Sequence, residues 1–295
     1  MSRIVVGDDG SEAGLLAVDW AAGEAARRGA SLHVVYVVTP WLFDVPADPG
    51  AARVRERLLD GGRDIVELAV ARARDRVPGL EVTGEQTGGQ PAEVLVEQGR
   101  DALMVVTGSR GSGGLPGLLL GSVAMQVATH AACPVVVARA PDADPLGDVV
   151  VGVDGSPAGA DAVGFAFEEA SLRGVRLRAL TAWTHPVPSG RGDMQPLVHD
   201  RAVVGAEEER VLAESLAGWR AEYPDVEVVS EAVNGRAARV LAGASADAGL
   251  LVVGSRGHGG FGGLLLGSVG HAMLARAHCP VAIVRGRGWP VRGGK

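Results

Sequence analysis

Short runs of apolar residues alternate along the chain with longer segments in which apolar positions recur at helical spacing. The runs at residues 4–6, 32–38 and 103–107 are rich in β-branched residues and have the length of buried strands. The segment 12–28 has helical spacing, and Ser11 before it is a natural N-cap. Strands that alternate with helices in this way predict an α/β fold with right-handed crossovers and a parallel sheet covered on both faces.

The same pattern occurs a second time in the other half of the 295-residue chain. We therefore predict two tandem doubly wound domains, residues 1–140 and 147–286, each with a five-stranded parallel sheet, joined by a linker at 141–146. The other expected strands lie at 81–86, 135–138, 149–151, 177–183, 226–232, 250–253 and 281–284, and the other expected helices at 51–76, 157–173 and 198–222, with short helices after residues 91 and 236 and a fourth helix after each glycine loop described below.

A glycine-rich stretch shows the duplication most directly. Residues 108–123 read GSRGSGGLPGLLLGSV and residues 254–269 read GSRGHGGFGGLLLGSV, so the copies differ at only three of 16 positions. Each copy follows an apolar run and contains too much glycine to form a helix or a strand, and helical spacing resumes after it. A glycine loop that leads from a strand into a helix N-terminus is suited to phosphate, because its backbone N–H groups can approach closely and the helix adds a partial positive charge.

The spacing of these residues resembles a known family. Gly108-x2-Gly111-x9-Gly121-Ser122 and its second copy, Gly254-x2-Gly257-x9-Gly267-Ser268, are similar to the nucleotide loop of ATP-binding universal stress proteins. The resemblance covers nearly the whole chain as two domains. It implies the strand order 3-2-1-4-5, in which the loops after strands 1 and 4 meet at a crevice outside the carboxyl ends of the strands.

The resemblance also implies one ATP site in each domain. The glycines and serines would hold ribose and phosphates, Asp9 and Asp154 would lie near adenine and ribose, and Val37 and Ala182 would flank adenine. The residues assigned to the two sites are Asp9, Val37, Thr107, Gly108, Arg110, Gly111, Gly121, Ser122 and Val123 in the first domain, and Asp154, Ala182, Val253, Gly254, Arg256, Gly257, Gly267, Ser268 and Val269 in the second.

Each assignment has a structural alternative. The two aspartates could simply accept hydrogen bonds from the amides of their own turns. Val37, Ala182 and the residues before the glycine loops could be core, and Arg110 and Arg256 could be solvated surface arginines. The copies also differ at Asp8, which stands where the second has Val153. Its charge would weaken ATP binding in the first domain, unless Asp8 points away from the ligand and caps the following helix.

Composition narrows the possible partners. The net charge of −7 argues against nucleic acid as an electrostatic partner. The chain shows no signal peptide and no apolar run of the roughly 18–20 residues that would span a bilayer, so we expect a cytoplasmic protein without membrane insertion. Cys133 and Cys279 occupy matching places and are expected to be buried core residues. The lone lysine, Lys295, is the last residue, which excludes a Walker-type phosphate lysine.

The sequence thus favours an ATP-binding universal stress protein that acts as a nucleotide-responsive regulator of stress or growth state. The competing hypotheses are a slow ATPase or adenine-nucleotide hydrolase of related fold, and a structural module with vestigial sites. No acidic pair stands beside the loops to hold Mg²⁺ as in P-loop enzymes, although Mg²⁺ bridging the phosphates directly is compatible with the motif. The apolar fifth strands favour edge pairing, and we expect a homodimer and an unidentified downstream protein partner.

Overall fold

The chain forms two compact α/β units, Met1–Ala140 and Pro141–Lys295, in a computed structural model. The structure describes residues 2–39, 49–111, 120–140, 147–184, 201–257 and 265–286. The predicted linker 141–146 and the middle of each glycine loop lie outside the described residues.

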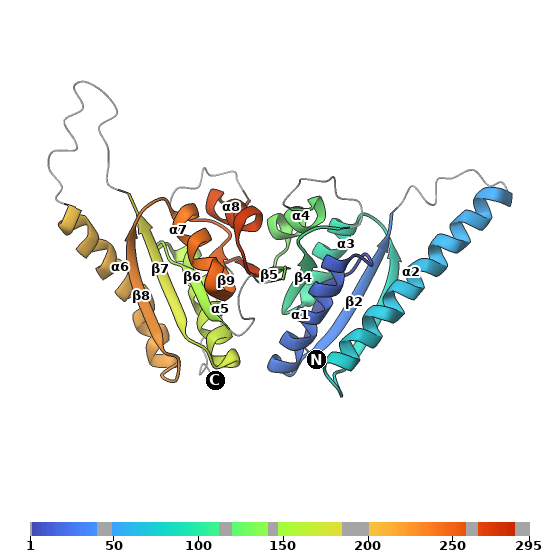
Figure 1. The fold of residues 1–295 in the computed structure, drawn as a ribbon, viewed down its shortest axis with the longest axis horizontal. Coiled ribbons are helices and arrows are strands. Elements are labelled where there is room, and N and C mark those ends of the chain that lie inside the picture. Colours follow the sequence, from blue (N-terminus) through green and yellow to red (C-terminus); the bar gives the residue numbers. More distant parts are fainter. Residues whose placement is uncertain are drawn as a thin grey trace, which may run out of the picture. The chain divides into compact units, whose positions relative to one another are not determined.

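The first unit contains a five-stranded parallel sheet in the order β3-β2-β1-β4-β5. This confirms the order implied by the glycine-loop resemblance. Figure 1 shows the helices packed on both faces of this sheet. The elements are β1 (Arg3–Gly7), α1 (Glu12–Arg28), β2 (Ser31–Val38), α2 (Pro49–Arg76), β3 (Val82–Gly88), α3 (Pro91–Gln98), β4 (Met104–Gly108), α4 (Ser122–His130) and β5 (Val135–Ala138).

The second unit repeats this arrangement, with five parallel strands in the order β8-β7-β6-β9-β10. Its elements are β6 (Asp148–Gly152), α5 (Pro157–Arg173), β7 (Leu177–Trp183), α6 (Arg201–Glu222), β8 (Val228–Asn234), α7 (Ala237–Ala244), β9 (Ala248–Gly254), α8 (Ser268–Arg276) and β10 (Val281–Val284).

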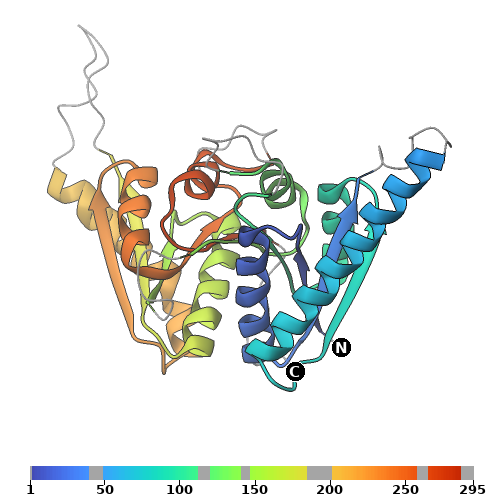
Figure 2. The same ribbon diagram turned by 45° about the vertical axis from the view of Figure 1, so that its right-hand side comes forward.

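Helices on both faces explain why the central strands are continuously apolar. Val5, Val105 and Val106 are fully buried in β1 and β4. On one face, a Cβ added at Gly108 would lie 2.6 Å from the backbone oxygen of Ala13 in α1, so α1 packs directly on the end of β4. On the other face, a Cβ at Gly7 would lie 2.7 Å from Leu95 in α3. Figure 2 shows α1 and α2 together on the first of these faces.

The edge strands end later than the sequence pattern predicts. β3 and β8 run to Gly88 and Asn234, two residues beyond the predicted 81–86 and 226–232. Val37 and Val38 of β2 still pair with Thr87 and Gly88. An edge strand can carry partly exposed polar residues along its whole length, so the apolar pattern stops before the backbone pairing does.

The starts of α1 and α5 and the burial of the two cysteines follow the sequence predictions, whereas α2 begins at Pro49, two residues before the predicted start, and the predicted start of α6 at 198 lies outside the described residues. Ser11 and Ser156 are the N-caps of α1 and α5, and each side chain accepts a hydrogen bond from a backbone N–H of the first turn. Cys133 and Cys279 are buried. Within the described ranges, no helix has the length and apolar character needed to cross a membrane.

Candidate functional site

The loop after β1 meets the glycine loop after β4 at the carboxyl end of the first sheet. A Cβ added at Gly111 would lie 2.5 Å from Oδ2 of Asp9, although the two residues are far apart in sequence. This contact arises because β1 and β4 are neighbours, with Gly7 opposite Thr107. In open α/β sheets the reversal of strand order at such a point is where ligands bind.

The second unit has the same contact between matching residues. A Cβ at Gly257 would collide with Oδ2 of Asp154, closer still than in the first unit. Both halves therefore bring a carboxylate oxygen against the backbone of the second glycine of the repeated motif, and no side chain fits between them. The expected convergence of the two loops is present in each unit.

The other oxygen of each aspartate belongs to its own turn. Oδ1 of Asp9 accepts a hydrogen bond from the Ser11 backbone N–H at 3.1 Å. Oδ1 of Asp154 accepts from the backbone N–H and the hydroxyl of Ser156, at 3.0 and 2.7 Å. The hydrogen bonds to the turn, which were the structural alternative for these aspartates, are therefore made by Oδ1, while Oδ2 lies against the glycine loop.

Backbone hydrogen bonds hold the two ends of each glycine loop together. The Gly121 N–H donates to the Ser109 carbonyl at 2.8 Å, and Gly267 donates to Ser255 at 2.7 Å. A Cβ at Gly121 would lie 3.8 Å from the Gly111 nitrogen, so the start of α4 is next to the glycine that contacts Asp9. The sequence analysis did not select Ser109 and Ser255, although both belong to the repeated motif and were visible in it.

The helix that follows each glycine loop has no side-chain cap. Gly121 and Gly267 are the N-caps of α4 and α8, and neither helix start receives a side-chain hydrogen bond among the described residues. By contrast, Ser11 caps α1, which starts at the same crevice. The uncapped first-turn N–H groups of α4 and α8 are therefore the donors better suited to an anion.

The remaining predicted residues border the same strand ends. The Val35 carbonyl accepts a hydrogen bond from the Asp8 backbone N–H, and Val37 lies two residues further along β2. Ala182 is at the equivalent position of β7. The side chains of Val37 and Ala182 are half-buried. Thr107 and Val253 are buried at the ends of β4 and β9, and the Thr107 hydroxyl has no partner among the described residues. Four of the predicted residues are exposed: Arg110, Arg256, Ser122 and Ser268. Four others are half-buried: Gly108, Gly254, Val123 and Val269. The two arginines are therefore on the surface, as their structural alternative predicted.

Asp8 is the clearest difference between the two crevices. Its residue is only 4% exposed, one carboxylate oxygen accepts from the Gly10 N–H at 3.1 Å, and the other has no hydrogen-bond partner among the described residues. Burial raises the pKa of Asp8 to about 6; the Gly10 hydrogen bond opposes this rise and the charge of Asp9 adds to it. Asp8 lies against Gly14 in the first turn of α1, but Ser11, not Asp8, caps that helix.

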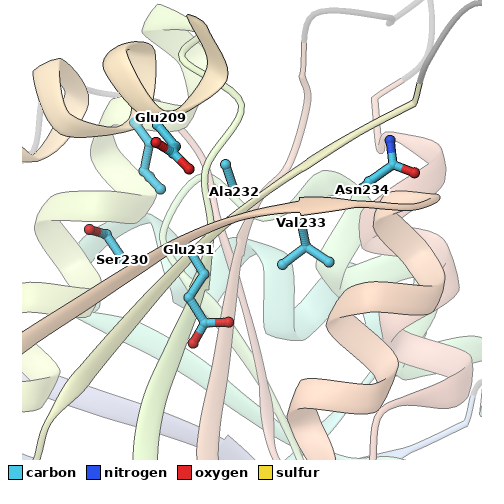
Figure 3. A pocket seen from close by; sticks show the side chains of 7 residues that line it. Glu209, Ser230, Glu231, Ala232, Val233 and Asn234 are labelled. Atoms are coloured by element: carbon cyan, nitrogen blue, oxygen red, sulfur yellow. The ribbon is translucent and has the colours of Figure 1, made fainter. Parts of the chain in front are cut away.

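A separate groove of about 620 Å³ lies along the edge strand β8. Its lining residues include Glu209 of α6 and Ser230, Glu231 and Asn234 of β8, which Figure 3 labels. It lies beside β8, whereas the crevice of the second unit lies at the ends of β6 and β9. Its two carboxylates would repel a phosphate, so we do not assign the groove to the nucleotide.

Comparison with known proteins agrees with the duplication of the chain. A model of the universal stress protein family matches residues 1–139 and again 146–285. The chain belongs to the universal stress protein family. Universal stress protein Rv2623 of Mycobacterium tuberculosis is 40% identical over 295 aligned residues, and universal stress protein Rv2005c of the same organism is 42% identical over 289; each alignment covers 96% of both chains.

A solved structure supports the fold independently. The crystal structure of a universal stress protein from Archaeoglobus fulgidus matches with a TM-score of 0.68 and 19% identity, covering 97% of each chain. The family assignment thus accounts for the tandem α/β architecture across nearly the whole sequence.

Proposed function

We propose that each half of this universal stress protein binds ATP at the crevice between the β1 and β4 loops, or their counterparts in the second unit. The observation that carries the proposal is the approach of Asp9 to Gly111 and of Asp154 to Gly257. In both units a carboxylate lies against the glycine loop where the strand order reverses, and the uncapped first turn of α4 or α8 follows that loop. A nucleoside phosphate needs hydrogen-bond acceptors for its hydroxyl and amino hydrogens, and it needs hydrogen-bond donors for its phosphates.

The charges of the site determine which part of ATP lies where. The carboxylates of Asp9 and Asp154 accept hydrogen bonds from ribose or adenine and repel phosphate, so the phosphates lie toward the first turns of α4 and α8. Ser122 and Ser268, the first residues of these helices, are exposed and can donate their hydroxyl protons to phosphate oxygens. Val37 and Ala182 provide apolar surface for adenine at the ends of β2 and β7. Mg²⁺, if bound, would bridge the phosphates directly.

We further propose that the protein works as a regulator that reports the nucleotide state to a downstream protein partner in the cytoplasm, as a homodimer. If ATP binds one conformation of the protein better than another, it raises the population of that conformation, and the partner can bind that conformation without any reaction of the nucleotide.

Analysis of the nucleotide carried by the freshly purified protein tests the proposal. Denaturing the protein and separating the released compounds by anion-exchange chromatography is expected to yield adenine nucleotide in stoichiometric amount, at most one molecule for each half. The double variant Gly111→Glu/Gly257→Glu, purified identically, is the control and is expected to release none. Nucleotide-free wild-type protein that also shows no heat of binding with ATP would refute the proposal.

A further inference from the structure

The two crevices differ at the position directly after the first strand, where the first has a buried carboxyl group and the second has a valine. Asp8 follows β1 directly, and Val153 has the same place after β6; these residues are 4% and 7% exposed. Both donate their backbone N–H to the second strand of their unit, Asp8 to Val35 at 3.0 Å and Val153 to Leu180 at 2.8 Å. The backbones are therefore equivalent, and the difference lies in the side chains alone.

The backbone N–H groups of Gly10 and Asp9 stabilise the negative charge of Asp8, but the cost of its burial outweighs them. Asp9, next in the chain, is a like charge. The cation that acts on Asp8 is Arg72 of α2, but both Arg72 nitrogens that face α1 are engaged by the carboxylate of Asp19, at 2.6 and 2.7 Å. The Val35 carbonyl of β2 accepts a hydrogen bond from the Asp8 backbone N–H, and Gly14 of α1 lies against the Asp8 carboxylate.

The phosphates of a nucleotide bound in the first crevice would add negative charge to the crevice that Asp8 borders. Asp9 reaches both neighbourhoods, because added Cβ atoms at Gly111 of the glycine loop and at Gly14, which lies against Asp8, would be 2.5 and 3.2 Å from its carboxylate oxygens. The bound anion therefore favours the neutral form of Asp8, and by reciprocity the proton on Asp8 favours the anion. A protonated Asp8 would also have a hydroxyl hydrogen to donate from the oxygen that has no hydrogen-bond partner in the described part of the chain.

We propose that nucleotide binding in the first half is coupled to proton uptake by Asp8, whereas binding in the second half is not. Asp8 thus gives the two sites different pH dependence, and it makes the first site the weaker one at neutral pH. This inference rests on the proposed ATP binding and adds its regulation by pH.

The direction of the effect follows from the pKa of Asp8, which burial raises to about 6. Below that pH the carboxyl group is neutral in the free protein and the anion meets no extra charge. Above it, binding must overcome repulsion or take up a proton. We expect the affinity of the first half for ATP, relative to the second half, to fall about threefold to tenfold between about pH 5.5 and pH 7.5.

Calorimetric titration of ATP into two variants separates the sites. Gly257→Glu leaves the first site, and Gly111→Glu leaves the second. The terminal phosphate of ATP itself changes its protonation over this pH range, and it does so in both experiments. The second half therefore serves as the control for proton changes that belong to the ligand. Repeating each titration in two buffers with different heats of ionisation gives the number of protons taken up on binding. We expect the first half to take up more protons per bound ATP than the second half.

Two substitutions test whether the additional proton uptake of the first half belongs to Asp8. Asp8→Asn keeps the size of the side chain, and is expected to remove the excess proton and make the pH profile of the first half match the second. The reciprocal Val153→Asp is expected to transfer the pH dependence to the second half. If both halves bind ATP with the same pH profile, or if Asp8→Asn leaves the difference unchanged, the inference is wrong while the proposed function stands. If neither half binds ATP at any pH, the proposed function fails and the inference fails with it.

Discussion

Replacing Gly111 with glutamate is expected to abolish ATP binding in the first half, and Gly257→Glu is expected to do the same in the second. A Cβ at Gly111 would already lie 2.5 Å from Oδ2 of Asp9, so any side chain must displace the aspartate. Glutamate adds a negative charge where the phosphates approach. We expect each affinity to fall by at least about 100-fold, which corresponds to about 2.7 kcal/mol of binding free energy.

Calorimetry measures the loss, and two other glycines provide matched controls. Gly61 in α2 and Gly243 in α7 have no atom within 4 Å of an added Cβ, so Gly61→Glu and Gly243→Glu add the same charge to the same units without obstruction. Both controls are expected to bind ATP as wild type does. Circular dichroism should show all four variants folded, since Gly111 and Gly257 are exposed. An unchanged ATP affinity in the Gly111→Glu/Gly257→Glu protein would exclude the glycine loops as the site.

The sequence was sufficient for the fold because its signals are local and occur twice. Apolar runs such as 4–6 and 149–151 lie within the central strands β1 and β6, and Ser11 and Ser156 mark helix starts by side-chain chemistry. The strand order came from the glycine-loop resemblance, and it places Asp9 beside Gly111. The contact between these residues depends on topology more than on any local preference, and it was predictable once the order was known.

The environment of individual side chains was not predictable in the same way. Asp8 and Asp9 are neighbours in the sequence, yet one carboxylate is buried against α1 and the other contacts the glycine loop. Their directions depend on the turn after β1, where Gly10 takes a φ of 76°. Hydrophobic patterning cannot distinguish two adjacent aspartates in a turn, because both are expected to be exposed there.

Burial of Asp8 leads to the second large effect, on stability: Asp8→Val is expected to stabilise the first unit at neutral pH. The folded protein raises the pKa of this carboxyl from 3.8 to about 6, so ionisation is more costly in the folded than in the unfolded chain. The contribution of Asp8 to the free energy of unfolding is therefore fully present at low pH, below the pKa of the unfolded chain, and is lost as the pH rises through about 6. A difference of about 2 pKa units is worth about 3 kcal/mol, and loss of the acceptor for the Gly10 N–H offsets about 1 kcal/mol of it.

The expected net gain of about 2 kcal/mol at pH 7.5 can be measured by hydrogen exchange of peptides from β1 and β4, with peptides from β6 and β9 as the reference. The gain should disappear at about pH 4, where Asp8 is protonated in the folded wild type and no charge is left to remove. Val153→Asp is the converse change, and is expected to destabilise the second unit by a similar amount at neutral pH. If Asp8→Val instead lowers protection of the first unit at pH 7.5, the ionised carboxylate stabilises the N-terminus of α1, and its interaction with that helix outweighs the cost of burial.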